Sequence, residues 1–313
     1  MHINIIFSGP LSTVVDGGRA GYMSVGFSSG GAMDLYSMRV ANILVGNEMD
    51  EGALEMTFMG ISAEFDSDAV IAITGADMSP KLNGEPIPMY EAVSVHSGDT
   101  LSMGKAESGM RAYLAVSGGF DIPMVMGSYS TNLKCGIGGF EGRKLKGGDA
   151  LPLRRSARLI KERKTKRENL YGSKIKVRVI LGPQDDYFTE RGKRDFLSRP
   201  YTVSEKSDRM GIRLSGTPVE NKNGVDIISD AVVMGSVQIP ASGEPIIMMA
   251  DRQTTGGYAK IATVIKADLP LVAQSYPGTE ITFVSVGYDK AVKLLKKQNE
   301  RLKRLKRKLN FTK

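Results

Sequence analysis

The sequence contains no tryptophan, one cysteine and two histidines among its 313 residues. A single cysteine excludes a disulfide within the chain, and Cys135 with His2 and His96 cannot supply the Cys and His ligands of a typical zinc site. No run of about 18 apolar residues is present, so we expect no membrane-spanning helix. The opening stretch MHINIIFSGP lacks the basic start and long apolar run of a signal peptide, and we therefore expect a cytoplasmic protein.

The net charge is unevenly distributed along the chain. Hydrophobic residues make up 41% and charged residues 24% of the sequence, which is typical of one large or two medium-sized globular domains. The formal net charge is +8, but residues 289–313 carry eleven bases and two acids, and residues 154–168 carry eight bases and two acids. The remainder is acidic, so the basicity does not mark the whole protein as a nucleic-acid binder.

The two basic segments have different patterns. Leucines at three- and four-residue spacings predict a basic amphipathic C-terminal helix over 289–313. They are Leu294, Leu295, Leu302, Leu305 and Leu309. Such a helix could bind nucleic acid or an anionic membrane surface, but we favour a terminal helix that docks its leucines and leaves its lysines in solvent. Residues 154–173 are interpreted as a basic linker between subdomains at 1–153 and 174–288.

The remaining pattern is mainly β. Short apolar or alternating runs, separated by Gly, Pro, Asn and Asp turns, have a spacing typical of barrels. Helices are predicted at 35–45, with Asp34 as N-cap and Gly46 after its end, and near 186–197, where Gly192 weakens the pattern. The turns SGDTLS (97–102) and PGTEIT (277–282) occupy comparable places in the two halves and indicate two related β-barrels.

Two glycine-rich clusters in the N-terminal half are candidate binding sites. Residues 12–22 and 28–34, STVVDGGRAGY and SSGGAMD, supply charges and flexible backbone, although glycine turns with an Asp16–Arg19 ion pair and a helix cap would give the same composition. Neither stretch is a Walker A loop or a GxGxxG motif. Residues 127–149 could cradle an anion in successive backbone N–H groups, beside the hydroxyls of Ser128, Ser130 and Thr131.

The third cluster is DRQTTGGYAK at 251–260, directly after the apolar run 246–250. Arg252 offers a planar fork suited to carboxylate or phosphate, and the residues after it offer amide, hydroxyl and open backbone contacts. If one strand holds Tyr258 and Lys260, both side chains face the same pocket, where a buried lysine can transfer a proton. The alternative is a structural turn in which Asp251 and Arg252 neutralise each other.

The order of the motifs resembles the biotin-dependent carboxyltransferase family from about residue 5 to 288. The motifs are TVVDGGRAG (13–21), GAMD (31–34), GSYST (127–131), GGFEGR (138–143), SDRMGIRLSG (207–216), VQIPASGEPI (237–246) and ADRQTTGGYAKIA (250–262). That family includes the allophanate hydrolase subunit 2 domain, KipA-type antagonists of the kinase inhibitor KipI, and the C subunit of 5-oxoprolinase. The resemblance implies a fold of two cyclophilin-like β-barrel subdomains.

The resemblance implies three possible functions. The first is the C subunit of a 5-oxoprolinase, which opens 5-oxoproline to glutamate with ATP and works beside two further subunits, one KipI-like (B) and one LamB/YcsF-like (A). The second is a biotin-dependent carboxyltransferase acting on urea or a related amide, and the third is a regulatory antagonist of a KipI-like inhibitor. The chain has no biotinylation sequence and no ATP-binding motif, so ATP or carboxybiotin would be supplied through partner subunits. We expect no covalently bound cofactor, no metal, and no membrane or nucleic-acid partner.

The candidate site residues follow from the clusters and the resemblance together. We assign catalytic roles to Lys260 and Asp34. The assigned substrate contacts are Arg252, Gln253, Thr254, Thr255, Gly256, Gly257, Tyr258, Asn42, Ser130, Thr131 and Arg19. The chain departs from the family pattern at Val15, Tyr129 and Asn132, where the family usually has Gln, Arg and Asp. An arginine and an acid are therefore missing from the implied site.

Overall fold

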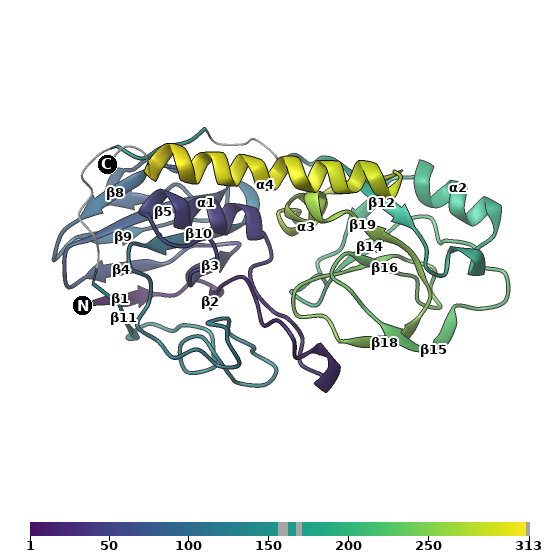
Figure 1. The fold of residues 1–313 in the computed structure, drawn as a ribbon, viewed down its shortest axis with the longest axis horizontal. Helices are drawn as coiled ribbons and strands as arrows, with labels where there is room; N and C mark the ends of the chain where they lie inside the picture. Colours follow the sequence, from purple (N-terminus) through teal and green to yellow (C-terminus); the bar gives the residue numbers. More distant parts are fainter. Residues whose placement is uncertain (156–161, 167–170, 311–313) are drawn as a thin grey trace. The chain divides into compact units, whose positions relative to one another are not determined.

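The computed structural model describes residues 1–155, 162–166 and 171–310 (Figure 1). The chain divides into two compact units. Unit 1 comprises Met1–Ala20, Gly30–Leu170 and Glu300–Lys313, and unit 2 comprises Gly21–Ser29 and Tyr171–Asn299. Segment 21–29 thus belongs to the unit formed by the second half of the sequence. Residues 156–161 and 167–170 of the predicted linker, and 311–313 of the predicted helix, lie outside the described residues.

The strands of unit 1 form two sheets. The six-stranded sheet has the order β11 (Ala150–Pro152), β1 (His2–Phe7), β4 (Ser62–Phe65), β9 (Thr100–Ser102), β6 (Lys81–Leu82) and β7 (Glu85–Pro86). The five-stranded sheet has the order β2 (Leu11–Val15), β3 (Ala53–Thr57), β10 (Ser108–Val116), β5 (Ala69–Asp77) and β8 (Ala92–Val95). Residues from both sheets share one hydrophobic core, which holds them together.

Helix α1 (Leu35–Val45) has the predicted bounds and covers the other face of the five-stranded sheet. Side chains of β10 alternate between the two cores: Leu114 faces the core between the sheets, and Tyr113 and Ala115 face the core beneath α1. Asp34 caps the helix by accepting the N–H of Ser37 at 2.9 Å. Gly46 ends it with a φ of 83°, a left-handed conformation that favours glycine.

Unit 2 contains a closed barrel, and the predicted mainly β class is confirmed. Its order is β12 (Lys174–Leu181), β19 (Lys260–Val264), β16 (Ser236–Gln238), β17 (Ile246–Met248), β14 (Gly211–Ser215), β13 (Tyr201–Val203) and β20 (Glu280–Ser285). Strands β15 (Asp226–Ala231) and β18 (Thr255–Tyr258) form a separate antiparallel ribbon. Strand periodicity predicts the strands but not which edges pair, so it did not distinguish this closed barrel from the two sheets of unit 1.

Short helices complete unit 2. They are α2 (Glu190–Ser198), α3 (Leu269–Ala273), η1 (Met23–Val25), η2 (Asp185–Tyr187) and η3 (Lys266–Asp268). Helix α2 confirms the helix predicted near 186–197. Glycine is required at position 192 of this helix, because a Cβ there would lie 2.2 Å from the carbonyl oxygen of Glu220. Close packing, and not a break in the helix, explains this glycine.

The two turns that suggested related halves have the same geometry. In SGDTLS, Asp99 N–H donates to His96 O at 3.0 Å, and in PGTEIT, Thr279 N–H donates to Tyr276 O at 2.9 Å. Gly98 and Gly278 each have a φ of 90° at the third turn position. Each turn therefore requires glycine there, and each leads into a strand, β9 or β20.

The basic C-terminal segment forms α4 (Tyr288–Asn310), which confirms the predicted helix (Figure 1). Residues 288–299 belong to unit 2 and 300–310 to unit 1. Within unit 1, Leu302 and Leu309 are buried in the core beneath α1, and Lys306 Nζ pairs with Glu48 at 2.6 Å. Leu302, Leu305 and Leu309 dock as expected. No helix in the described part of the chain is long and apolar enough to cross a membrane.

Replacing Leu309 with alanine is expected to lower the free energy of unfolding by about 2 kcal/mol, because its side chain is 7% exposed within that core. Urea unfolding followed by circular dichroism measures the change. Lys303, which is exposed on the same helix, provides the control. Lys303→Ala should change the unfolding free energy by less than about 0.5 kcal/mol. Equal losses in the two variants would contradict the docked helix.

Candidate functional site

Residues 251–260 do not form a single strand or loop. Thr255–Tyr258 make up β18 in the two-stranded ribbon, and Lys260 begins β19 in the barrel. Because the chain changes sheet between Tyr258 and Lys260, the alternation argument that placed both side chains in one pocket does not apply. Tyr258 is 42% exposed, whereas Lys260 is 2% exposed. The buried lysine is therefore the better candidate for chemistry in a protected environment.

Arg252 is buried among neutral acceptors. Its side chain is 4% exposed; Nε donates to Val232 O at 2.9 Å and Nη1 donates to Met249 O at 3.2 Å. Nη1 also lies 3.4 Å from Ser29 Oγ, and Nη2 lies 3.8 Å from Met23 Sδ. Burial lowers the pKa of Arg252 from its ordinary value. A desolvated guanidinium with uncharged partners is a favourable environment for an incoming carboxylate or phosphate.

The neighbouring acid has a different partner. Asp251 accepts two hydrogen bonds from Arg209, at 2.8 Å from Nε and 3.1 Å from Nη2. Asp251 therefore forms its ion pair with Arg209 and not with Arg252, although its charge also acts to raise the pKa of Arg252. Arg209 lies in the SDRMGIRLSG motif, 42 positions earlier in the chain. Local sequence could not reveal this pairing, because it depends on how β14 and β17 pair in the barrel.

Amide side chains surround the start of the ribbon. Gln253 Nε2 lies 3.4 Å from Gln238 Oε1, and Gln238 Nε2 lies 3.4 Å from Tyr258 O. A Cβ at Gly256 would lie 2.7 Å from Gln238 Nε2, so this glycine permits the close approach of a side chain of the protein itself. Thr254 accepts the N–H of Val232 through its carbonyl, and Thr255 is exposed on β18. The amide groups here can orient a polar ligand.

Lys260 pairs with a residue that the sequence analysis missed. Its Nζ lies 2.7 Å from Asp230 Oδ2, on β15. Gln184 bonds to both residues: its Oε1 accepts the Lys260 N–H at 3.1 Å, and its Nε2 donates to Asp230 Oδ2 at 3.3 Å. The sequence signal for Asp230 was weak, because it is one of two acids in the strand-like run VDIISDAVV (225–233). The hydrogen bond from Lys260 lowers the pKa of Asp230.

In unit 1, the first two glycine-rich clusters meet at Asp16. This carboxylate is 5% exposed and accepts hydrogen bonds from the hydroxyls of Ser128 and Ser130, at 2.7 and 2.6 Å. It also accepts the backbone N–H groups of Gly18 and Tyr129, at 2.8 and 2.6 Å. The cluster ties the loop after β2 to the loop at 127–131. Ser130 is brought to this centre, but its hydroxyl is already bonded there.

The other predicted contacts in unit 1 also bond within the protein. Arg19 donates to the carbonyls of Val125 and Ser130, and Thr131 Oγ1 donates to Val14 O at 2.9 Å. Asn42 Nδ2 donates to Glu51 O at 2.8 Å, and Asp34 serves as the cap of α1. All four predicted residues are buried: Arg19, Asp34, Asn42 and Thr131. Their catalytic or substrate-binding roles remain predictions.

The glycine-rich loop at 127–149 uses several of its N–H groups internally. Gly139 N–H donates to Tyr129 O at 2.8 Å, and Gly142 N–H donates to Gly138 O at 2.9 Å. A Cβ at Gly142 would lie 2.0 Å from Gly136 O, so close backbone packing requires glycine there. Arg143 in the same loop forms two hydrogen bonds to Asp149, at 2.7 and 2.9 Å. These groups stabilise the loop and are not directed at an anion.

The three departures from the family pattern lie in packed surroundings. Val15 is fully buried beneath α1, in the same core as that helix. Tyr129 packs against the core between the sheets, and the guanidinium of Arg154 lies 5.5 Å from the centre of its ring. Asn132 Oδ1 accepts the N–H of Cys135 at 3.0 Å. Each of these three side chains therefore makes packing or hydrogen-bond contacts within the protein.

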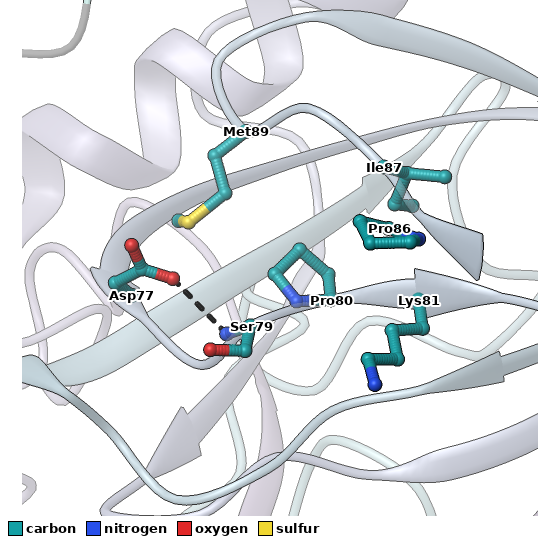
Figure 2. Close-up of a pocket in the computed structure, with 7 residues that line it drawn as sticks. All are labelled: Asp77, Ser79, Pro80, Lys81, Pro86, Ile87 and Met89. Atoms are coloured by element: carbon teal, nitrogen blue, oxygen red, sulfur yellow. Dashed lines mark hydrogen bonds between the residues drawn. The ribbon is translucent and has the colours of Figure 1, made fainter. Parts of the chain in front are cut away.

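A cavity of about 440 Å³ lies elsewhere in unit 1. Figure 2 shows its lining, drawn from the end of β5 and from the β6–β7 hairpin. The residues are Asp77, Ser79, Pro80, Lys81, Pro86, Ile87 and Met89. Asp77 Oδ1 accepts the N–H of Ser79 at 3.0 Å. None of the residues assigned to the site lines this cavity. Among the described residues, no group of three His, Cys, Asp or Glu could hold a metal ion.

Comparison with known proteins gives a consistent result. The chain is 39% identical to the C subunit of 5-oxoprolinase from Escherichia coli, over 97% of both chains, and 38% identical to that of Haemophilus influenzae, over 95% of both. It is 36% identical to urea amidolyase of Saccharomyces cerevisiae, over 97% of this chain but 18% of that protein. The crystal structure of the K. lactis urea amidolyase matches with a TM-score of 0.89 at 32% identity, over 97% of this chain and 20% of that one.

These relatives cover almost the whole chain, and the first two have nearly the same length. The urea amidolyases are several times longer, so this chain spans about a fifth of them. The model of the carboxyltransferase domain, subdomains A and B, matches residues 25–285, which include the ribbon, the barrel and the loop at 127–149. The chain therefore belongs to the family of carboxyltransferase domains built from subdomains A and B.

Proposed function

We propose that this chain is the C subunit of an ATP-dependent 5-oxoprolinase, which opens 5-oxoproline to glutamate. The observation that carries the proposal is the match to two relatives of that name over at least 95% of each chain. Two sequences of similar length that align throughout have the same domain content. The match to the urea amidolyases, in contrast, involves a small part of much longer proteins.

The chemistry of unit 2 suits this substrate. 5-Oxoproline is a five-membered lactam that bears a carboxylate. Arg252, buried among neutral acceptors, would bind that carboxylate, and the amide of Gln253 would hydrogen-bond the lactam. Ring opening adds water to the lactam carbonyl, breaks the C–N bond and gives the nitrogen a proton. Lys260 would stabilise charge on the carbonyl oxygen or supply that proton.

ATP would reach the reaction through partner subunits. The two relatives are named as one subunit of 5-oxoprolinase, which implies a complex, and we assign a KipI-like protein and a LamB/YcsF-like protein as the partners. In the glycine-rich loop of unit 1, the N–H groups of Gly139 and Gly142 bond to the chain's own carbonyls, so these two groups are not available to a phosphate.

A second candidate function is carboxyl transfer from carboxybiotin to urea or a related amide. The high structural similarity to the urea amidolyase domain favours it, with a TM-score of 0.89. Lys260 and Arg252 could serve that chemistry as well, since both provide positive charge for a carboxylate. The two functions differ in the donor that they require, ATP in one case and carboxybiotin in the other.

Reconstitution tests the proposal. The purified chain alone is expected to show no ATP hydrolysis and no opening of 5-oxoproline, and both activities should appear when the KipI-like and LamB/YcsF-like partners are added. Glutamate formation and phosphate release measure the result. Turnover by the isolated chain would contradict the assignment. Carboxylation of urea from carboxybiotin would instead support the second function, and tight binding of the KipI-like protein without either activity would indicate a regulatory antagonist.

A further inference from the structure

Lys260 occupies the first position of β19, opposite Gln238 of β16. The side chain of Lys260 is 3% exposed. A buried ammonium group needs a compensating charge, because burial removes the water that would otherwise solvate it.

Asp230 provides the compensating charge from the ribbon. Its carboxylate lies 2.7 Å from Lys260 Nζ, and its side chain is 50% exposed. The pair therefore joins a buried cation to an anion that water can reach. Asp230 Oδ1 also accepts the backbone N–H of Ala231 at 2.7 Å, and this hydrogen bond orients the carboxylate.

Gln184 connects the pair to the barrel wall. Its side chain bonds to the main chain of Lys260 and to the carboxylate of Asp230, and its own N–H donates to Lys260 O at 3.2 Å. The amide thereby holds β19 and β15 at a fixed separation. The strand β15 belongs to the same ribbon as β18, where Asp230 stands opposite Gly256. The ion pair thus lies beside the DRQTTGGY stretch.

Charged groups on the elements that pack against β19 have other partners. On β12, Arg178 pairs with Asp268 at the start of α3. On η2, Asp185 lies 3.7 Å from Lys193 of α2. Among the described residues, Asp230 is the carboxylate within ion-pair distance of Lys260. This acid therefore supplies the counter-charge of Lys260.

We infer that Asp230, held by Gln184, is a positioning residue that holds the side chain of Lys260 in place beside the start of the ribbon. This inference rests on the proposed function, in which Lys260 supplies positive charge or a proton to the amide substrate. The carboxylate does not itself need to touch the substrate. Its hydrogen bond with Lys260 lowers the pKa of Asp230, so the carboxylate remains ionised at neutral pH and the pair is lost only as the solution becomes acidic.

Nuclear magnetic resonance of the full chain with labelled lysines tests the inference without enzyme activity. Lys260→Met assigns the signal. In the wild type, the Lys260 side chain should give the signal of an immobilised group, because its Nζ is held by Asp230. In Asp230→Asn, the signal should move and become that of a mobile side chain, because the ion pair is lost. Asp230→Glu should restore the wild-type signal, and Asp226→Asn, on the same strand, should leave it unchanged. An unaltered Lys260 signal in Asp230→Asn would overturn the inference.

Turnover of the assembled complex provides the second measurement. For Asp230→Asn we expect kcat to fall about tenfold or more, with KM little changed, because Lys260 acts after substrate binds. Asp230→Glu should recover most of the lost kcat. An NMR shift with wild-type kcat would overturn the positioning role. An NMR shift together with an inactive wild-type complex would contradict the proposed function and leave the Lys260–Asp230 coupling established.

Discussion

Replacing Arg252 with lysine is expected to lower turnover of the assembled complex about a hundredfold, the usual scale for one positioned electrostatic group. The guanidinium donates from Nε and Nη1 to the carbonyls of Val232 and Met249, while Nη2 lies near the thioether of Met23. Lysine keeps the charge but has one nitrogen, so it cannot satisfy both carbonyls and also bind a carboxylate in a planar fork.

Two controls separate this effect from a loss of folding. Arg178→Lys changes a second arginine of unit 2, which pairs with the buried Asp268, and turnover should stay within about twofold. Thermal unfolding of Arg252→Lys should show a loss of roughly 1–3 kcal/mol, since one buried carbonyl loses its donor. Wild-type turnover in Arg252→Lys would mean that the arginine only supports the main chain. A similar loss of turnover in Arg178→Lys would show a general response of the barrel.

Replacing Asp16 with alanine is expected to lower the free energy of unfolding by about 3–5 kcal/mol. Its carboxylate is nearly inaccessible and accepts four hydrogen bonds, two from hydroxyls and two from backbone N–H groups. The substitution leaves these buried donors without an acceptor and separates the loop after β2 from the loop at 127–131. Urea unfolding measures the change.

Asp50→Ala is the matched control for Asp16→Ala, because it deletes a carboxylate close by in the same unit. Asp50 pairs with Arg39 at 2.8 Å, but its side chain is 52% exposed. We expect a loss of no more than about 1 kcal/mol, as is typical of exposed ion pairs. Equal losses in the two variants would show that the Asp16 cluster does not hold unit 1 together, and would reopen a ligand-binding role for the 127–131 loop.

The sequence by itself determined the features that depend on neighbours within a few residues. Asp34 and Gly46 fix the ends of α1 because capping groups act on the adjacent turn. The leucines of α4 predict its docked face, and glycines 98 and 278 predict two matching turns with positive φ. The order of the motifs also identified the family, because several short sequence motifs in the same order along the chain are specific to it.

Tertiary structure alone decided which of the candidate groups meet. Asp251 pairs with Arg209 instead of Arg252, and Lys260 pairs with Asp230, a residue that no motif indicated. The chain changes sheet between Tyr258 and Lys260, which separates two side chains that a single strand would have placed together. These outcomes depend on strand register and on contacts 30 or more positions apart, where a shift by one residue reverses every side chain. Local patterns indicate which residues can do chemistry, and the pairing of distant strands determines which of them form ion pairs.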